Sequence, residues 1–176
     1  MSAGGGTTAR VVDHAGVDKA EVHAALLSAL EKDRDTLVAA QRLSAEGVTH
    51  PDARSDGSKD MRATEASYIA RGQAQRAEAL EADVAKVRRM ALRAFGEGDA
   101  VAVSALVTLL VGEDEERVVF IAPAGGGVRV ALDGVTVHVV TPISPMGRAI
   151  VGAQVGDVLE LERGGGVTEL SIEGIV

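Results

Sequence analysis

The chain has 176 residues, contains no cysteine and carries a formal net charge of -8 at pH 7. Its length allows one domain or two small ones with a real core, and the lack of cysteine excludes disulfides and thiolate sites. The acidic balance and the lack of Trp, with one Tyr and two Phe, argue against tight, sequence-independent binding to nucleic acid. We therefore expect a protein partner, with any nucleic-acid contact confined to a local patch.

The sequence shows neither a secretory signal pattern nor an apolar run of about eighteen residues, the length that a membrane-spanning helix needs. Together with the lack of cysteine, this favours a cytoplasmic protein with no membrane contact. Residues 1–16 contain three consecutive glycines and little periodicity, so we expect them to form a flexible tail.

Residues 17–95 contain two long segments with helical periodicity. The first is expected over Asp18–Glu46, with Asp18 as its N-cap and Gly47 as its stop. The second is expected over about Lys59–Phe95. In both segments apolar residues recur at helical spacings: Val22, Leu26, Leu30, Leu37, Ala40 and Leu43 in the first, and Ala66, Ile69, Leu80, Val84, Val87 and Ala91 in the second.

Helices of this length would each span roughly 40 Å, too long for the core of a small domain. The two segments would most naturally bury their apolar stripes against each other as an antiparallel coiled-coil hairpin, which predicts a monomer. The tip, at about residues 47–60, then presents the carboxylates of Asp52, Asp56 and Asp60 at the end of a stalk. Such a tip could hold a metal ion inside a partner's cavity, or it could be a solvated polar loop.

The composition changes at residues 96–104, a predicted linker, and β-branched residues dominate 105–176. Asp133-Gly134 between valine-rich runs indicates a two-residue hairpin, and Ser144–Val151 predicts a short helix capped by Ser144. The predicted strands are Ala105–Val111, Arg117–Ala122, Val128–Leu132, Val135–Val140, Val158–Glu162 and Thr168–Ile175. The predicted fold class is α+β: an N-terminal helical hairpin followed by a small antiparallel β-sheet domain with one short helix.

The block Thr141–Val158, followed by glycines and the closing segment Thr168–Ile175, resembles the C-terminal domain of the Gre family of bacterial transcript-cleavage factors. It contains a similar Ser-Pro-x-Gly-Arg-Ala motif from Ser144, then Gly-Asp, then a final hairpin. Val107–Glu116, an apolar strand that runs into an acidic turn, also resembles that family's first C-terminal strand. The order of elements agrees with the one predicted from periodicity.

This resemblance implies an antiparallel coiled coil joined to an FKBP-like C-terminal domain. It also implies binding to RNA polymerase: the globular domain docks at the rim of the secondary channel, and the hairpin reaches toward the active centre. The chain would then be an accessory factor that stimulates the polymerase's own hydrolysis of backtracked RNA, not an enzyme itself. By the same resemblance, polymerase docking falls on Ser144, Pro145, Met146, Gly147 and Arg148.

The Gre tip presents an Asp and a Glu that help to hold a second Mg²⁺ in the polymerase active site. In register, Asp56 matches that Asp, but Lys59 stands where the family has its Glu, and an ammonium repels Mg²⁺. Asp60, one residue on, could supply the missing carboxylate. The resemblance therefore assigns catalysis and a Mg²⁺ shared with the polymerase to Asp56 and Asp60, with Asp52 in reserve and Glu65 as a further candidate.

The second helical segment carries several arginines where Gre proteins have a basic patch that faces the backtracked RNA 3′ end. The alternative is that these residues are solvated and pair with neighbouring acids on the helix. No DNA contact is expected. The candidates are Arg71, Arg76, Arg88 and Arg89.

Other functions stay open at this point. A protein of this fold could occupy the channel without promoting cleavage, as an inhibitor or regulator, and Lys59 favours that hypothesis. A prolyl isomerase is disfavoured, because it needs an aromatic-lined pocket and this domain has few aromatic residues. A coiled-coil interaction module unrelated to transcription would leave the C-terminal motif unexplained.

Overall fold

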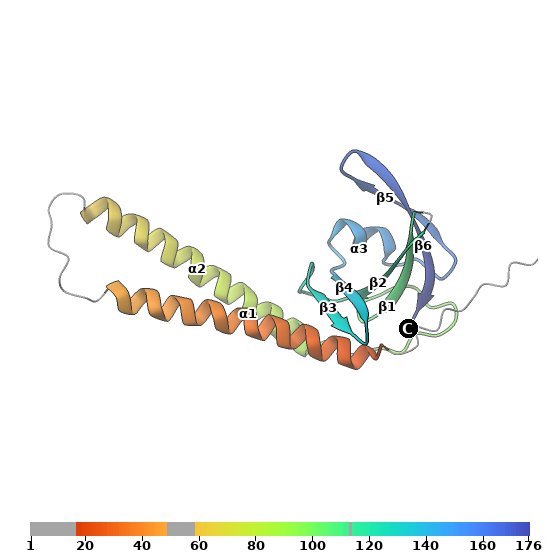
Figure 1. The fold of residues 1–176 in the computed structure, drawn as a ribbon, viewed down its shortest axis with the longest axis horizontal. Coiled ribbons are helices and arrows are strands. Elements are labelled where there is room, and N and C mark those ends of the chain that lie inside the picture. Colours follow the sequence, from red (N-terminus) through yellow and green to blue (C-terminus); the bar gives the residue numbers. More distant parts are fainter. Residues whose placement is uncertain (1–16, 49–58, 113) are drawn as a thin grey trace, which may run out of the picture.

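We describe the chain from a computed structural model, which covers residues 17–48, 59–112 and 114–176. Two long helices project from a β domain (Figure 1), so the predicted α+β class is confirmed. The elements are α1 Lys19–Val48, α2 Lys59–Arg88, β1 Leu106–Val111, β2 Glu115–Ile121, β3 Arg129–Leu132, β4 Val135–Val140, α3 Pro145–Ile150, β5 Val158–Arg163 and β6 Gly166–Ile175.

Helix α1 begins where the sequence predicts. The Asp18 carboxylate accepts a hydrogen bond from the backbone N–H of Ala20 at 2.8 Å, and the Asp18 carbonyl accepts the first helical bond from Val22 at 3.0 Å. The helix ends at Val48 and so passes through Gly47, which was expected to stop it. A single glycine inside a helix costs only about 1 kcal/mol, so it does not oblige the helix to end.

Helix α2 ends at Arg88, earlier than the predicted Phe95, because the backbone beyond it finds other partners. The His23 ring donates from Nε2 to the Val87 carbonyl at 2.8 Å, and the N–H of Met90 closes a tight turn on the same carbonyl at 3.1 Å. The predicted linker 96–104 packs onto the β domain, where Val101 is buried and exchanges backbone hydrogen bonds of 2.8 Å with residues 152 and 153.

The six predicted strands are all observed and form one sheet in the order β3-β4-β2-β1-β6-β5. Asp133 and Gly134 have φ angles of 49° and 82°, so the predicted two-residue hairpin has the left-handed turn that these residues favour. The expectation of a purely antiparallel sheet is wrong for one pair, because β2 and β4 run parallel. After β2 the chain crosses to the sheet edge to form β3, and the hairpin then returns β4 alongside β2 (Figure 1).

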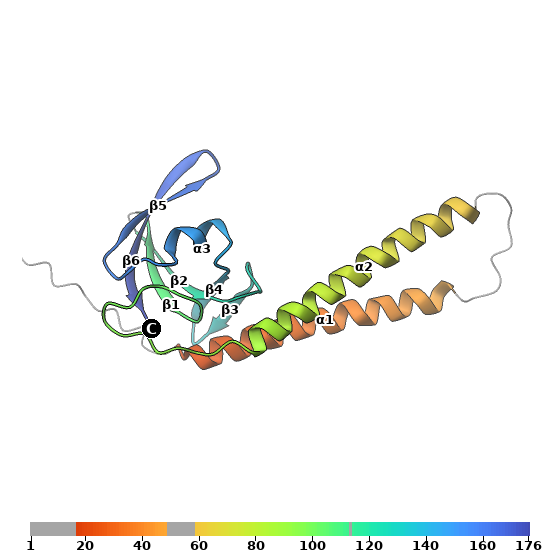
Figure 2. The same cartoon turned by 180° about the vertical axis from the view of Figure 1, so that it is seen from behind.

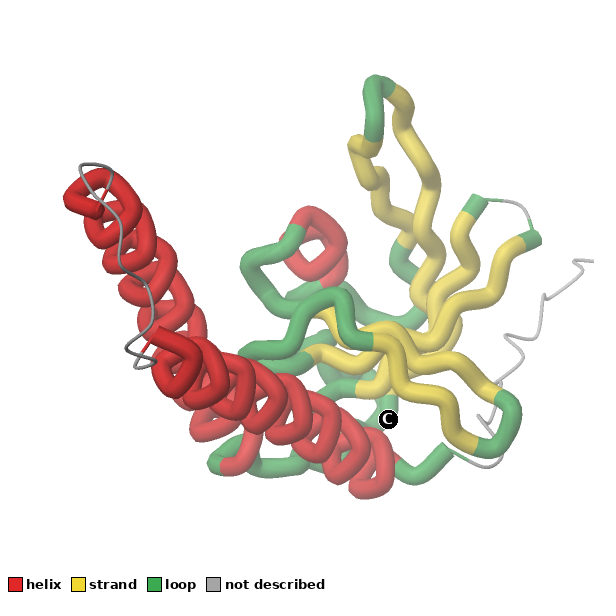
Figure 3. The backbone as a smooth tube through the Cα atoms, turned by 60° about the vertical axis from the view of Figure 1, so that its left-hand side comes forward, coloured by secondary structure: helices red, strands yellow, loops and turns green. Residues whose placement is uncertain are grey.

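Each face of the sheet has its own core. The base of the helical hairpin covers one face, where Leu26 of α1 and Val87 of α2 are fully buried in the same cluster as Phe120. A Cβ at Gly125 would lie 2.8 Å from Leu26 Cδ1 and would displace that side chain, and the φ of 80° would strain any other residue at this turn. The other face is covered by α3, and Ile150 is fully buried there. The β5–β6 hairpin extends beyond the other strands (Figure 3).

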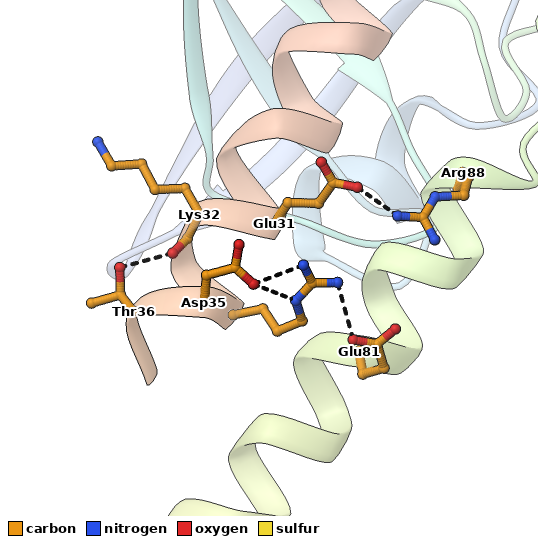
Figure 4. Close-up of polar contacts among 7 residues, drawn as sticks. Glu31, Lys32, Asp35, Thr36, Glu81 and Arg88 are labelled. Atoms are coloured by element: carbon orange, nitrogen blue, oxygen red, sulfur yellow. Dashed lines mark hydrogen bonds and ion pairs between the residues drawn. The ribbon is translucent and has the colours of Figure 1, made fainter. Parts of the chain in front are cut away.

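The two long helices pack together near the sheet and diverge toward their far ends (Figures 1 and 2). Ion pairs between Arg88 and Glu31, at 2.5 Å, and between Arg34 and Glu81, at 3.2 Å, join them in the proximal half (Figure 4). Farther out, Leu43 is 70% exposed and Ile69 is 56% exposed. The predicted pairing of the apolar stripes therefore holds near the sheet and fails in the distal half.

A matched pair of leucine variants tests this division of the hairpin. Leu26→Ala should lower the free energy of unfolding by about 2–5 kcal/mol, because it leaves a cavity in a core shared by helices and sheet. Leu43→Ala should change it by less than about 0.5 kcal/mol, because that side chain is already in solvent. Equilibrium urea unfolding measures both, and equal losses would contradict the observed packing.

Candidate functional site

The short helix α3 carries the segment that the sequence assigned to docking. Ser144 has the extended backbone of an N-cap, with φ -68° and ψ 159°, and Pro145 occupies the first turn. The Ser144 hydroxyl accepts from the Gly147 N–H at 3.0 Å and donates to the Thr141 carbonyl at 2.8 Å. The predicted cap is confirmed, and it fixes the direction in which α3 leaves β4.

Gly147 allows α3 to lie directly against the preceding turn. A Cβ at this position would be 1.9 Å from the Thr141 carbonyl oxygen and 3.0 Å from Pro142 Cα. Next to it, the Arg148 guanidinium donates to the Ile143 carbonyl at 2.6 Å while its side chain is exposed, and Ile143 is itself 79% exposed. Arg148 of α3 and Ile143, two residues before α3, are therefore both exposed to solvent. The backbone that holds them tolerates no side chain at position 147.

A cleft of about 620 Å³ lies beside α3. Ser144, Pro145 and Met146 form one side of it, and residues of β2, β3, β4 and β5 complete it. None of the described residues that line it is Phe, Tyr or Trp, whereas Phe120 is fully buried in the core. This lining does not suit a pocket for proline. The further lining residues are Arg117, Gly126, Gly127, Val128, Arg129, His138, Val139, Val140, Thr141, Leu161, Glu162 and Gly164.

Three of these side chains form a basic wall that the sequence analysis did not identify. Arg129 of β3 pairs directly with His138 of β4, and His138 pairs with Val119 of β2, two residues from Arg117. Burial lowers the pKa of His138, and the positive charges of Arg117 and Arg129 lower it further. The imidazole is therefore neutral at pH 7 between two arginines. The signal in the sequence was a polar residue at each of three strand positions that share one face of the sheet, and this shared face is recognised only once the strands are paired.

The predicted catalytic and metal residues belong to the expected hairpin tip, at about residues 47–60. Asp52 and Asp56 fall outside the described residues, so the structure does not place them. Lys59 and Asp60 open α2, at the end farthest from the sheet (Figure 1). Glu65 follows five residues later on the same helix, roughly 7.5 Å along its axis. Within the described ranges, no group of three or more Cys, His, Asp or Glu side chains is placed to hold a metal ion.

The four arginines proposed as an RNA-facing patch have different environments. Arg71 and Arg76 are exposed on the distal part of α2. Arg88 pairs with Glu31 of α1, and Arg89 donates from Nε to the Ala85 carbonyl of its own helix at 3.1 Å. The ion pair of Arg88 joins the two helices, and all four arginines are exposed, so the RNA-facing patch stays a prediction.

Comparisons with known proteins complete the description of the site. No family model matches the sequence, and no curated protein matches it. Among solved structures, the chain is similar to the transcription factor Gfh1, at 24% identity over 87% of this chain and 92% of the other, with a TM-score of 0.36. It is also similar to GreA factor homolog 1 (Gfh1) of Thermus thermophilus, at 23% identity over 88% and 94%, with a TM-score of 0.35. For Gfh1 of Thermus aquaticus the values are 21% identity, 84% and 92%, and a TM-score of 0.38.

In the part of the chain that the structure describes, no helix is both long and apolar enough to cross a membrane.

Two glycine variants test the packing of α3. Gly147→Ala should lower the free energy of unfolding by about 1–3 kcal/mol, because the new methyl group overlaps the Thr141 carbonyl and forces the helix to move. Gly72→Ala in α2 should raise it by about 0.5–1 kcal/mol, because no atom lies within 4 Å of the new Cβ and alanine favours helix. Urea unfolding reports both values, and a neutral Gly147→Ala would show that α3 can shift freely.

The basic wall predicts how His138 titrates. Its pKa should lie below the ordinary 6.5, and Arg129→Gln should raise it toward that value by removing a positive charge. Because the folded state then binds fewer protons than the unfolded state just below pH 6.5, this residue makes the protein less stable as the pH falls through that range. NMR titration of the imidazole measures the pKa in both proteins. A pKa above 6.5, or one that Arg129→Gln does not change, would contradict this arrangement.

Proposed function

We propose that the chain is a Gre-like accessory factor that binds bacterial RNA polymerase and places its helical hairpin in the secondary channel. The observation that carries this proposal is the Ser144–Arg148 motif on a capped, tightly packed α3 beside a cleft. In its sequence this motif resembles the docking domain of Gre factors. A surface held this rigidly suits docking to a partner.

The shape of the molecule supports the same function. Helices α1 and α2 have 30 residues each and span roughly 45 Å. Their bases are buried against the sheet, so the hairpin leaves the β domain in a fixed direction (Figure 2). A stalk fixed in this way can deliver its tip to a point far from the docking surface. This is what an accessory factor needs in order to act inside a partner's channel.

We further propose that Asp56 and Asp60 assist cleavage of backtracked RNA. Carboxylate oxygens are the donors that Mg²⁺ prefers, so the residue types at the tip fit this ion, and Asp52 adds a third carboxylate nearby in the sequence. When bound, such an ion would supply an activated water for phosphate hydrolysis. Two carboxylates alone hold Mg²⁺ weakly, so the polymerase would have to provide the remaining ligands.

Lys59 favours a second candidate function. It opens α2 next to Asp60, and its ammonium opposes the binding of a cation at the tip. A factor with this tip could enter the channel and regulate the polymerase without promoting cleavage.

A cleavage assay separates these functions. The protein is added to a backtracked elongation complex and the RNA length is followed, with binding measured in parallel on the same complex. Cleavage assistance predicts shortened RNA, and either Asp56→Ala or Asp60→Ala should slow this by at least about tenfold, the loss typical of weakened metal ligation. Lys59→Glu should accelerate it by restoring a carboxylate.

Asp33→Ala provides the control, because Asp33 is an exposed carboxylate on the proximal half of α1 and should not affect cleavage. Binding with intact RNA would reject assisted cleavage and favour the regulator. A protein that does not bind the complex at all would contradict both functions.

A further inference from the structure

The cleft beside α3 contains a basic wall that the docking motif does not explain. Arg129, His138 and Arg117 come from β3, β4 and β2, which are neighbours in the sheet. His138 pairs with Arg129 on one side and with Val119 on the other. Arg117 lies two residues before Val119 on the same strand, so the side chains of Arg117, His138 and Arg129 share one face of the sheet. This is the face opposite to the one that the helical hairpin covers, so the basic wall is separate from the hairpin.

Both arginines retain the capacity to bind an anion. Only 18% of the Arg117 side chain is exposed; its Nη2 pairs with Glu115, but its buried Nε has no acceptor among the described residues. A buried donor without a partner is costly, so a movement of the Arg117 side chain that lets a ligand accept from Nε would add to the affinity. Arg129 is exposed, and its side chain forms no ion pair or hydrogen bond with another described residue. The lining includes one carboxylate, Glu162, against these two guanidinium groups.

The remaining wall of the cleft is apolar. Pro145 and Met146 of α3, Val128 before β3 and Leu161 of β5 contribute to it. The cleft therefore combines an apolar surface with guanidinium groups that can bind a carboxylate through paired hydrogen bonds. Its described lining contains no Phe, Tyr or Trp side chain for stacking a nucleic-acid base, and the whole chain carries a net charge of -8. These features favour a peptide over a nucleic acid.

We propose that this cleft binds an acidic segment of a partner protein, with an apolar side chain against Met146 and Leu161 and a carboxylate on Arg117 and Arg129. The proposal deepens the proposed function and rests on it for the identity of the partner: the cleft shares Ser144, Pro145 and Met146 with the docking motif, so the segment would belong to the polymerase. The guanidinium groups would select the acidic residue, and the α3 wall would select its apolar neighbour.

The proposal is tested by measuring the binding of a peptide to the full chain in the absence of polymerase. The probe is the peptide Ac-Leu-Glu-Leu-Glu-NH2, titrated into isotope-labelled protein and followed by the NMR signals of the arginine Nε–H groups and of the His138 ring. The matched peptide Ac-Leu-Gln-Leu-Gln-NH2 removes the charge at constant shape. We expect the acidic peptide to shift the signals of Arg117, Arg129 and His138 and to bind at least about tenfold more tightly than the amide peptide.

Variants locate the binding. Arg129→Gln should weaken the acidic peptide about tenfold, and because Arg129 is exposed, the variant should fold normally. Arg117→Gln should act in the same direction. Arg42→Gln is the control, since this exposed arginine lies on α1 and does not line the cleft. Equal weakening by Arg42→Gln would overturn the assignment, because it would indicate general charge attraction.

Two other results would also overturn the assignment of the cleft to an acidic peptide. One is equal affinity for both peptides, and the other is a higher affinity for inorganic phosphate than for the acidic peptide, measured by displacement. The latter would assign the wall to a phosphate group. Polymerase binding by the same variants is measured separately. A protein that binds the peptide but not the polymerase would leave the cleft assignment intact and contradict the proposed function.

Discussion

The structure depends on the burial of the hairpin base against one face of the sheet. Val22 and Leu26 of α1 and Val87 of α2 are completely buried, and they share one hydrophobic core with Phe120 of the sheet. Apolar burial of this kind supplies most of the stability of a small domain. At the same junction, Lys19 and Arg93 lie over the Phe95 ring at 4.9 and 4.7 Å, which ties the start of α1 to the segment after α2. The hairpin is therefore part of the fold of the β domain and not an appendage.

This junction divides the molecule into surfaces with different tasks. The helices cover one face of the sheet, so the opposite face, with α3 and its cleft, is the one available to bind a partner. The helices diverge beyond the junction, and among the described side chains of their distal parts Leu43 and Tyr68 are exposed. The described parts of the helices are buried mainly at their bases, on the face opposite to the cleft.

The sequence predicts the local elements well, because their signals are local. Asp18 and Ser144 cap their helices, and Asp133-Gly134 forms the hairpin, since each of these effects involves only a few neighbouring residues. The parallel pairing of β2 with β4 and the early end of α2 could not be predicted, because they depend on contacts between distant segments. The basic wall was missed for the same reason. Its residues are separated in the chain and meet only in the paired sheet.

Entry of the hairpin into the secondary channel of RNA polymerase, as we propose, can be tested directly. Because the chain contains no cysteine, Ser58→Cys provides a unique site for an iron chelate that cuts nearby polypeptide. Bound to an elongation complex, the labelled tip should cut the polymerase beside its catalytic centre, whereas a label at Ser171→Cys in β6 should cut only near the rim. If the label at position 58 cuts far from the catalytic centre, or if both labels give the same cuts, the hairpin does not enter the channel.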